Sequence, residues 1–382
     1  MSILKSVKIQ ENIPLKNLTA FRIGGPARYF VKIENLEDIK DAFSFAEKNN
    51  LKVFVLGSGS NLLISDAGFD GLVISPDMRG IEKIEENARE NKDEVKLKVG
   101  SGEDWDTVVA YAVDAGFWGM ENLSYIPGKV GGVPMQNVGA YGQEAANIVE
   151  SVEVYDITEK KVKIIKNAEC EFGYRESRFN KREKGKCIIL SVLFKLKKTS
   201  VPNMKYLDVE NYFKEKNIAQ PSLKEMREAI VWIRKNKLPD PAKIGNAGSF
   251  FKNLILNEKE LKELFKNIRK NTNEETVNKL IDIRNRLFSP SGVKIPTAFL
   301  VDVVCGLKGF KMGGVKVHDR QPLVLVNESG EATAKEVLNL ARYVMQEVYK
   351  KTGIKIYPEP ELVGFTEEEV QRYLLIDPNN KN

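Results

Sequence analysis

The sequence predicts an α+β protein with a mixed N-terminal domain and a second, C-terminal domain. Its 382 residues exceed what one hydrophobic core usually contains, because domains typically hold roughly 100–200 residues. Between residues 15 and 196, short apolar runs alternate with amphipathic stretches, which indicates strands alternating with helices. Residues 197–203 are polar and include a proline, and longer amphipathic stretches follow them. We therefore expect a domain boundary near this polar stretch.

The N-terminal elements follow from the spacing of apolar residues. Residues 36–48 predict a helix that begins after Asn35, and residues 52–56 predict a short buried strand. A further helix is expected to end at Gly116. Its buried face would consist of Trp105, Val108, Val109 and Ala112. More strands are expected at residues 72–75, 95–99, 149–155 and 187–196.

The C-terminal part predicts longer helices with capped ends. Ser222 and Glu225 form a capping box ahead of one apolar face. Thr333 and Glu336 cap the last long helix, which Gly353 ends. The apolar faces expected to be buried are Leu223, Met226, Ile230 and Ile233; Leu261, Leu264, Phe265 and Ile268; and Val337, Leu340, Ala341, Val344 and Val348.

Residue types exclude several kinds of chemistry. The sequence has one histidine, His318, which excludes Ser-His-Asp catalysis, Cys-His catalysis and sites built from several histidines. Cys170, Cys187 and Cys305 are too few and too widely spaced for a disulfide framework or a zinc site. We therefore expect no metal and a reducing compartment. Catalysis must depend on hydroxyl, carboxylate, lysine or arginine side chains, or on a cofactor.

The net charge of +6 has two interpretations: a solvated basic surface, which we favour, or attraction of anionic ligands such as dinucleotides and sugar nucleotides. Lys and Arg are interleaved with Asp and Glu, which argues against nucleic-acid binding. No apolar run approaches the roughly 20 residues that span a membrane, and the first ten residues lack the apolar region of a secretory signal. We expect a cytoplasmic monomer that binds neither membrane nor nucleic acid.

Two glycine-containing stretches are candidates for binding a cofactor. In residues 56–61 (LGSGSN), two glycines let successive amides face one concavity that suits a phosphate, and Ser60 and Asn61 add donors. A plain tight turn explains this stretch equally well, because it lacks the third glycine of a dinucleotide fingerprint. Residues 126–142 are rich in glycine and contain two prolines, so they cannot form regular helix or strand. A long irregular loop of this kind usually binds a ligand.

Three further segments carry polar side chains that suit catalysis. Arg175 lies among aromatic residues, and its guanidinium suits a carboxylate or phosphate unless it is only a surface arginine. Ser249 follows small residues and precedes two phenylalanines, so it either donates a proton to a developing carbanion or occupies a glycine-rich turn. Glu359 and Glu361 flank a proline in an extended stretch and are either a catalytic pair or solvated edge charges.

Taken in order, these five segments resemble the UDP-N-acetylenolpyruvoylglucosamine reductase family, the MurB family of peptidoglycan synthesis. The resemblance extends from about residue 15 to residue 365, and the opening LTAFRIGGPA is similar to that family's first motif. It implies a two-lobed FAD-binding domain, like that of vanillyl-alcohol oxidase, followed by an α+β substrate-binding domain. The implied boundaries are 1–75 and 76–200 for the two lobes, 201–370 for the substrate-binding domain and 371–382 for a tail.

The resemblance also implies roles for individual residues. Ser249 would donate a proton, and Arg175 and Glu361 would stabilise an enolate-like intermediate. FAD would be bound without a covalent link, by Gly57, Ser58, Gly59, Ser60, Asn61, Pro127, Gly128, Gly131, Gly132, Gln136, Asn137, Gly139 and Ala140. The substrate, a UDP-sugar, would be bound by Tyr141, Tyr206, Lys237, Lys252 and Asn253, with Tyr206 on a loop that closes over the uridine.

The implied function is NADPH-dependent reduction of UDP-N-acetylglucosamine enolpyruvate to UDP-N-acetylmuramate through FAD. Three places depart from the family pattern: Leu254 stands where proline is usual, Asp302 lies one position from the expected acid, and residues 362–365 (LVGF) are a loose version of the family's final strand. His318 is expected to be structural and not a flavin attachment site. The alternatives are another FAD-dependent oxidase or dehydrogenase on the same fold, and a non-catalytic nucleotide-binding homologue.

Overall fold

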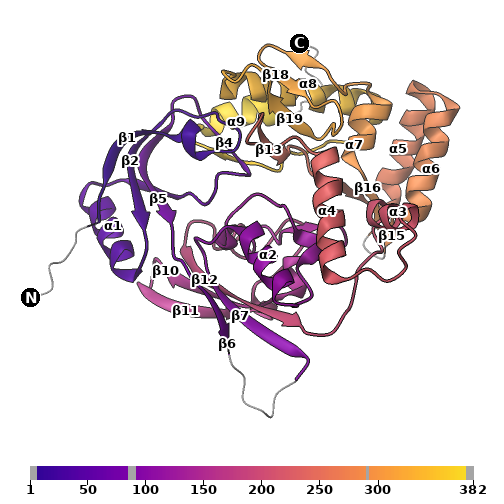
Figure 1. Ribbon diagram of the computed structural model, residues 1–382. Helices are drawn as coiled ribbons and strands as arrows, with labels where there is room; N and C mark the ends of the chain where they lie inside the picture. Colours follow the sequence, from indigo (N-terminus) through magenta and orange to yellow (C-terminus); the bar gives the residue numbers. More distant parts are fainter. Residues whose placement is uncertain (1–6, 85–91, 290–291, 376–382) are drawn as a thin grey trace, which may run out of the picture. The chain divides into compact units, whose positions relative to one another are not determined.

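The computed structural model describes residues 7–84, 92–289 and 292–375, which divide into two compact units (Figure 1). Unit 1 contains Met1–Ile13, Ala27–Ser58 and Asp70–Asn236. Unit 2 contains Pro14–Pro26, Gly59–Phe69 and Lys237–Asn382. Two short N-terminal segments therefore belong with the C-terminal half of the chain. Helices and strands occur in both units, as the α+β prediction requires.

The first sheet of unit 1 is covered by one helix. Its strand order is β1 (Gln10–Pro14), β2 (Pro26–Ile33), β5 (Phe69–Pro76) and β3 (Lys52–Val55), and β3 pairs with β5 in parallel. The helix, α1 (Leu36–Lys48), begins at Asn35, whose side chain accepts hydrogen bonds from two amides of the first turn. Ile39, Ala42 and Ala46 on α1 are fully or almost fully buried in one cluster with the apolar residues of β2 and β5.

The second sheet of unit 1 is antiparallel throughout. Its strand order is β11 (Lys161–Lys166), β10 (Val149–Asp156), β12 (Cys187–Lys197), β7 (Glu94–Gly100) and β6 (Ile81–Ile84). Helix α2 (Trp105–Asp114) buries its expected apolar face against this sheet's core, and the indole nitrogen of Trp105 donates to the Leu123 carbonyl (2.9 Å). Unit 1 also contains the short elements η2 (Glu121–Leu123), η3 (Val130–Gly132), β8 (Gly139–Ala140), β9 (Gln143–Glu144), η4 (Ala145–Asn147) and η5 (Asn167–Glu169).

Two helices expected in the substrate-binding domain lie in unit 1. Helices α3 (Leu207–Glu215) and α4 (Leu223–Lys237) bury their apolar faces in the same core as α2, and only Lys237 of α4 is assigned to unit 2. Arg227 on α4 donates two hydrogen bonds to the carboxylate of Asp106 on α2 (2.7 and 2.9 Å). The compact units therefore part at residue 236 and not near residue 201, while the expected division into two lobes and a substrate-binding domain stays a prediction.

Unit 2 has one core that three small sheets and four helices share within the described residues. The sheets have the strand orders β13 (Gly245–Ser249), β19 (Val324–Asn327), β18 (Val315–Val317), β17 (Lys311–Met312); β14 (Leu254–Leu256), β16 (Gly292–Ile295), β15 (Phe288–Ser289); and β20 (Glu361–Val363), β4 (Leu62–Ile64). The helices are α5 (Glu258–Asn271), α6 (Glu274–Arg286), α8 (Ala334–Thr352) and α9 (Glu367–Leu374). The short elements are η1 (Leu15–Leu18), α7 (Thr297–Phe299) and the π-helical η6 (Leu300–Val304).

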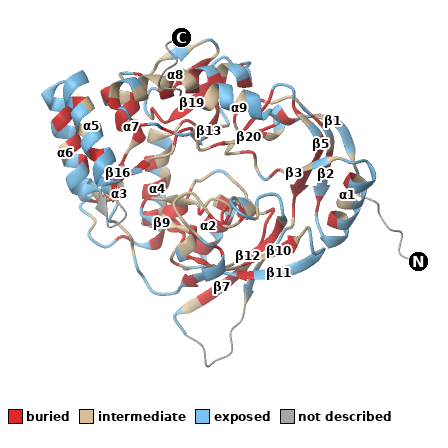
Figure 2. Cartoon of the chain, turned by 180° about the vertical axis from the view of Figure 1, so that it is seen from behind, coloured by how far each residue is buried: buried red, intermediate tan, exposed pale blue. Residues whose placement is uncertain are grey.

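The longest helix of unit 2 has the ends that the sequence predicts. Thr333 and Glu336 form the capping box of α8, and Gly353 ends the helix with a left-handed backbone (φ +71°). Figure 2 shows buried residues along α8 and along its neighbour β19. Across the three described ranges, no helix combines the length and the apolar character needed to cross a membrane.

Candidate active site

Unit 2 brings together the segments of two predicted catalytic residues. Ser249 is the last residue of β13, and the carbonyl of the next residue, Phe250, accepts a hydrogen bond from the amide of Glu359 (2.8 Å). The amide of Lys252 donates to the same neighbouring segment (3.0 Å). Because these main-chain hydrogen bonds align the two segments, Ser249 and Glu361 belong to adjoining stretches of chain.

Glu361 also adjoins the first glycine-containing turn. Its amide donates to the carbonyl of Asn61 (3.0 Å), and from this point β20 runs parallel to β4. The side-chain amide of Asn61 reaches the carbonyl of Glu359 at 3.4 Å. Asn61, Ser249 and Glu361 are therefore part of one hydrogen-bonded framework within unit 2.

The N-terminal motif links the glycine turn to the serine strand. Gly59 has a left-handed backbone (φ +65°), and a Cβ there would lie 2.3 Å from the carbonyl oxygen of Leu18, so the position requires glycine. The Gly59 carbonyl accepts from the amide of Ala20, and the Ala20 carbonyl accepts from the amide of Asn246 (3.1 Å each). The motif at residues 18–27 thus positions the turn relative to β13.

The residues after Ser249 are held by Thr297. Its hydroxyl donates to the carbonyl of Lys252 (2.6 Å), and its amide donates to Oδ1 of Asn253 (3.0 Å). Leu254, where the family usually has proline, is buried and lies opposite Ile295 in the pairing of β14 with β16. Leucine at this position is therefore accommodated in a regular pair of strands. The second departure, Asp302, forms an ion pair with Lys308 (2.8 Å).

The second glycine-containing stretch lies in unit 1 and is bonded to the turn that precedes α2. The Gly128 carbonyl accepts from the amide of Trp105 (3.0 Å), and the Gly131 amide donates to the carbonyl of Ser101 (2.9 Å). A Cβ at Gly131 would lie only 3.0 Å from the Cβ of Ser101. The close approach of the Ser101 turn explains the glycine at position 131.

The buried carboxylate of Asp77 forms an ion pair with a lysine of the same stretch. Lys129 Nζ donates to Oδ1 of Asp77 (3.3 Å) and to the carbonyl of Pro76 (3.2 Å). Lys32 and Arg79 also bind Asp77 (2.6 and 2.5 Å). Burial alone would raise the pKa of the Asp77 carboxyl, but the hydrogen bond from Lys32 and the charge of Lys129 outweigh burial, so the pKa is lowered. Asp77 carries no sequence motif and was not predicted.

Arg175 is bonded to the far end of the second glycine stretch. Its Nη2 donates to the carbonyl of Gly139 (2.9 Å), and its guanidinium lies 5.5 Å from the ring centroid of Tyr174. The side-chain amide of Asn137 donates to the carbonyl of Gly173 (3.0 Å). Three predicted site residues, Arg175, Asn137 and Gly139, are therefore joined within unit 1.

The two tyrosines predicted to bind substrate are in contact. The rings of Tyr141 and Tyr206 meet edge to face with centroids 5.2 Å apart, and Tyr206 remains 44% exposed. Asn122 donates to the carbonyl of Tyr141 (2.8 Å) and to that of Asn203 (2.9 Å), which fastens the segment ahead of Tyr206. No local pattern in the sequence identified Asn122 or Asn203.

The residues present fit a bound cofactor. A Cβ at Gly57 or Gly132 would meet no atom of the described chain within 4 Å, and both glycines are exposed. The hydroxyl of Ser101, on the turn bonded to Gly131, is buried and has no hydrogen-bond partner among the described residues. A buried hydroxyl that lacks a partner is a feature of a site completed by a ligand, and the open space beside the two glycines leaves room for one. A pyrophosphate-containing cofactor such as FAD suits both.

The side chains that could attach a flavin covalently are those of His318 and the three cysteines. Nδ1 of His318 accepts from the amides of Arg320 (3.4 Å) and Gln321 (3.2 Å), and burial together with the charge of Arg320 lowers its pKa. Burial raises to about 12 the pKa of each of the three thiols, those of Cys170, Cys187 and Cys305. All three are free thiols, and none is a reactive thiolate near neutral pH.

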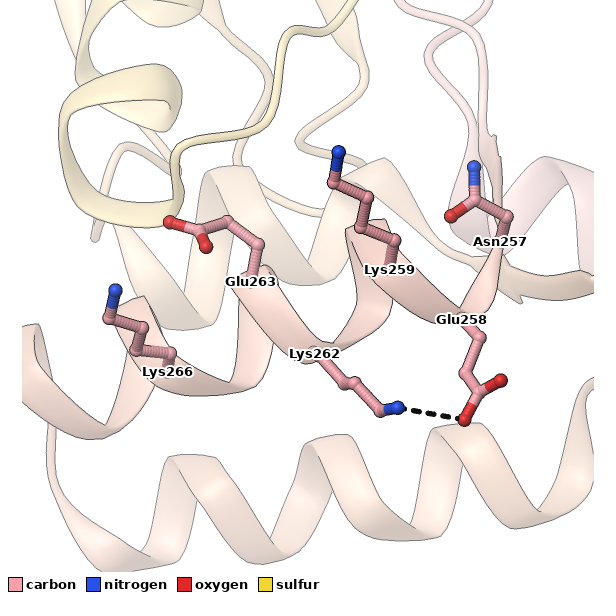
Figure 3. Close-up of a pocket in the computed structure, with 6 residues that line it drawn as sticks. All are labelled: Asn257, Glu258, Lys259, Lys262, Glu263 and Lys266. Carbon is pink, nitrogen blue, oxygen red and sulfur yellow. Dashed lines mark ion pairs between the residues drawn. The ribbon is translucent and has the colours of Figure 1, made fainter.

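One hollow on unit 2 is separate from every predicted site residue. Figure 3 shows that it follows one helix, α5, and that Glu258, Lys262 and their neighbours line it. Glu258 and Lys262 form an ion pair (3.0 Å), as expected for a solvated helix face.

No cluster of three potential metal ligands occurs within the described residues.

Comparison with known proteins assigns the chain to a family. Residues 27–164 match the model of an FAD binding domain, and residues 240–363 match that of the UDP-N-acetylenolpyruvoylglucosamine reductase C-terminal domain. A UDP-N-acetylenolpyruvoylglucosamine reductase of Flavobacterium johnsoniae is 39% identical over 358 residues, which are 94% of this chain and 100% of that protein. The chain belongs to the UDP-N-acetylenolpyruvoylglucosamine reductase family.

Further members of the reductase family agree with this assignment. The reductase of Neisseria meningitidis serogroup A is 36% identical over 353 residues, 92% of this chain and 96% of that protein. The solved structure of the Thermus caldophilus reductase covers 94% of this chain and 98% of its own, with a TM-score of 0.59 and 24% identity. The resemblance stated from the sequence and the predicted fold are thereby confirmed: an FAD-binding domain and a reductase C-terminal domain.

The predicted residues are distributed over both matched domains of this reductase family member. The two glycine-containing stretches lie in the FAD-binding match. Ser249, Lys252, Asn253 and Glu361 lie in the C-terminal match. Arg175, Tyr206 and Lys237 lie between the two matches. As a member of this family the protein is an enzyme, and the roles of its individual residues stay predictions.

Proposed function

We propose that this enzyme reduces UDP-N-acetylglucosamine enolpyruvate to UDP-N-acetylmuramate, with NADPH as the reductant and FAD as a non-covalent cofactor, for peptidoglycan precursor synthesis. One observation carries the proposal: the Ser249 and Glu361 segments are hydrogen-bonded side by side within the domain that matches the reductase family. Relatives named for this reductase match more than nine-tenths of the chain, which supports the same substrate.

The catalytic roles follow from where charge develops. When bound, FAD would supply the hydride chemistry that no protein side chain can provide. Negative charge then develops on the substrate carbon that bears the carboxylate. Arg175 stabilises this charge, because a preorganised cationic donor needs little reorganisation during the reaction, and we assign Glu361 to the same intermediate. Ser249 donates its hydroxyl proton to the same carbon.

The binding roles follow from charge and space. We assign FAD to the two glycine-containing stretches, because Gly57 and Gly132 leave open space and Ser101 offers a buried hydroxyl. Lys237 and Lys252 neutralise the diphosphate of the sugar nucleotide, and Asn253, Tyr141 and Tyr206 contact its remainder. The structural surroundings of His318 support non-covalent binding. Flavin should therefore stay in the supernatant when the protein is precipitated with acid.

We further assign the enzyme to the cytoplasm, as a monomer. Its three free thiols suit a reducing compartment, and NADPH and sugar nucleotides are cytoplasmic metabolites. Light scattering on the purified protein tests the monomer, for which the expected mass is that of one 43.1 kDa chain.

An anaerobic two-step experiment tests the function. NADPH is added to the yellow protein until the oxidised-flavin absorbance disappears, and UDP-N-acetylglucosamine enolpyruvate is then added. We expect the absorbance to return at once, with one UDP-N-acetylmuramate formed per flavin. Reduced flavin that the enolpyruvyl substrate leaves reduced, but that reoxidises rapidly once oxygen is admitted, would instead assign the enzyme to the oxidases. Bound FAD that NADPH cannot reduce would assign it to non-catalytic homologues.

A further inference from the structure

The turn that carries Arg175 is bonded to the second glycine stretch at three alternate residues. The bonds run from Ser177 Oγ to the Met135 carbonyl (2.8 Å), from Asn137 Nδ2 to the Gly173 carbonyl (3.0 Å) and from Arg175 Nη2 to the Gly139 carbonyl (2.9 Å). Residues 133–137 form a turn, in which Asn137 has a left-handed backbone (φ +45°). The bond from Asn137 is the one of the three that reaches the residue two positions ahead of Arg175.

Asn137 is buried, and protein groups take up both hydrogens of its side-chain amide. Its Nδ2 donates to Oε2 of Glu144 (2.9 Å) as well as to Gly173, and its Oδ1 accepts from the amide of Ala146 (2.9 Å). Only 2% of the residue is exposed. A hydrogen bond donated by this side chain to FAD, as one form of the contact that the sequence resemblance implied, would have to replace one of the two bonds from Nδ2.

The main chain of Arg175 is fixed from its other side. Its backbone is left-handed (φ +57°), and its carbonyl accepts from Nδ2 of Asn180 (3.1 Å). The Oδ1 of Asn180 accepts from the amide of Ser177 (2.9 Å), which closes the turn on itself. The turn is therefore held by its own hydrogen bonds, and the three bonds to the glycine stretch fix its place relative to that stretch.

We propose that Asn137 is a positioning residue that fixes the guanidinium of Arg175 for stabilising the developing charge, without itself contacting substrate. This inference rests on the proposed function, in which Arg175 acts on the enolpyruvyl carboxylate. A catalytic group displaced by about 1 Å can cost roughly 100-fold in rate, so loss of the bond from Asn137 to the Arg175 turn should have a measurable effect. Gly139 contributes to the same geometry, since a Cβ there would lie 3.3 Å from Nη1 of Arg175.

The test is a double-mutant cycle between Asn137→Gly and Arg175→Ala. Asn137 has a left-handed backbone (φ +45°), which glycine adopts without strain, so Asn137→Gly removes the amide and its three hydrogen bonds without straining the backbone. Fluorescence titration of the apo-protein measures the Kd for FAD, and anaerobic stopped-flow measures flavin reduction by NADPH and reoxidation by the enolpyruvyl substrate separately.

We expect Asn137→Gly to leave the Kd for FAD within about 2-fold and flavin reduction intact, and to slow reoxidation about 10- to 100-fold. In the Arg175→Ala background the same change should slow reoxidation no further, because Asn137 acts through Arg175. A merely structural role for Asn137 predicts the same fractional loss in both backgrounds.

Two results would overturn the inference. One is an additive cycle, and the other is a loss of FAD affinity large enough to account for the slower turnover, which would make Asn137 a cofactor ligand. If Asn137→Gly does not fold, Ser177→Ala, which removes the neighbouring bond to Met135, takes its place in the same cycle with the same expectations. If the enolpyruvyl substrate does not reoxidise the wild-type protein, the proposed function itself is refuted. This outcome is distinct from a failure of the inference about Asn137.

Discussion

At the scale of single residues, Asp77 illustrates how a buried charge supports a binding loop. Its carboxylate lies between Lys32, Arg79 and Lys129, and only Lys129 belongs to the glycine stretch. Removing the carboxylate would leave three cations together without their shared partner. Lys129 ties the stretch to the end of β5 through Pro76 and Asp77, so under the proposal that this stretch binds FAD, loss of the carboxylate also affects the cofactor.

Asp77→Asn should therefore lower both stability and FAD affinity. We expect the free energy of unfolding to fall by roughly 1–3 kcal/mol, the value typical of hydrogen bonds to charged groups, and the Kd for FAD to rise. Urea denaturation and fluorescence titration measure the two effects. Asp70→Asn is the matched control: Asp70 pairs with Arg28 but is 85% exposed, so its loss should change stability by less than about 1 kcal/mol. Equal effects of the two substitutions would argue against the role of Asp77.

His318 predicts a pH dependence of stability. Burial, with the charge of Arg320, lowers its pKa below 6.5, so the unfolded chain binds this proton more readily than the folded protein does. The stability contributed by neutral His318 is fully present above about pH 6.5 and is lost as the pH falls through the lower, folded-state pKa.

His318→Asn isolates this contribution. The Oδ1 of asparagine can accept the same two amides as Nδ1 of histidine, but it does not titrate. Between about pH 8 and about pH 5, the Tm of the wild-type protein should fall further than that of the variant. Parallel Tm curves would mean that protonation of His318 does not destabilise the fold.

At the scale of elements, strong periodicity was predictable and short strands were not. The helix at residues 36–48 has the bounds predicted from the sequence, because its apolar spacing and its Asn35 cap are both local signals. Strand β13 has the sequence GNAGS, which favours a turn, and it becomes a strand only through pairing with β19. Likewise β4 and β20 pair across nearly 300 residues of sequence, a contact with no local signal.

The glycine stretches allow a test of ligand space. Gly57 is exposed, has no atom of the described residues within 4 Å of a Cβ, and does not need a left-handed backbone. Gly57→Ala should therefore change the free energy of unfolding of the apo-protein by less than about 1 kcal/mol, while weakening FAD binding at least about 10-fold because the methyl group occupies cofactor space. Titration of the apo-protein with FAD measures the second effect, and unaltered affinity would mean that this turn does not bind the cofactor.

Gly364→Ala provides the opposite case as a control. A Cβ there would lie 2.0 Å from the carbonyl oxygen of Gly68, and the backbone is left-handed (φ +78°). We expect roughly 1–3 kcal/mol or more of lost stability in the apo-protein. The pair separates glycines that the fold requires from glycines that a ligand requires.

At the scale of the whole molecule, the chain order conceals the division into units. Phe21, Ile23 and Leu63 are buried in the core of unit 2, although they precede most of unit 1 in sequence. Conversely, Val209 and Phe213 complete a core of unit 1. The sequence predicts a domain boundary where its composition changes. It does not reveal that short segments belong to the other unit, because the residues that these segments contact lie far away along the chain.

Some residues of the candidate site could be predicted from the sequence and others could not, for the same reason. The order of five motifs indicated the family, and the segments of Ser249, Asn61 and Glu361 are joined within unit 2. The supporting residues Asp77, Ser101 and Asn122 gave no signal, since each acts through contacts with residues far along the chain. The motifs thus predicted the function, whereas the contacts that position the functional residues became visible only in the structure.

The central claim is that Ser249 donates the proton that completes reduction of the enolpyruvyl group. Anaerobic stopped-flow on Ser249→Ala tests it most directly, with the wild-type protein as reference. We predict that NADPH reduces the flavin of the variant at the wild-type rate, and that reoxidation by the enolpyruvyl sugar nucleotide falls roughly 100- to 1000-fold, equivalent to about 3–4 kcal/mol of barrier. Reoxidation at the wild-type rate, or equal loss of both half-reactions, would contradict the account.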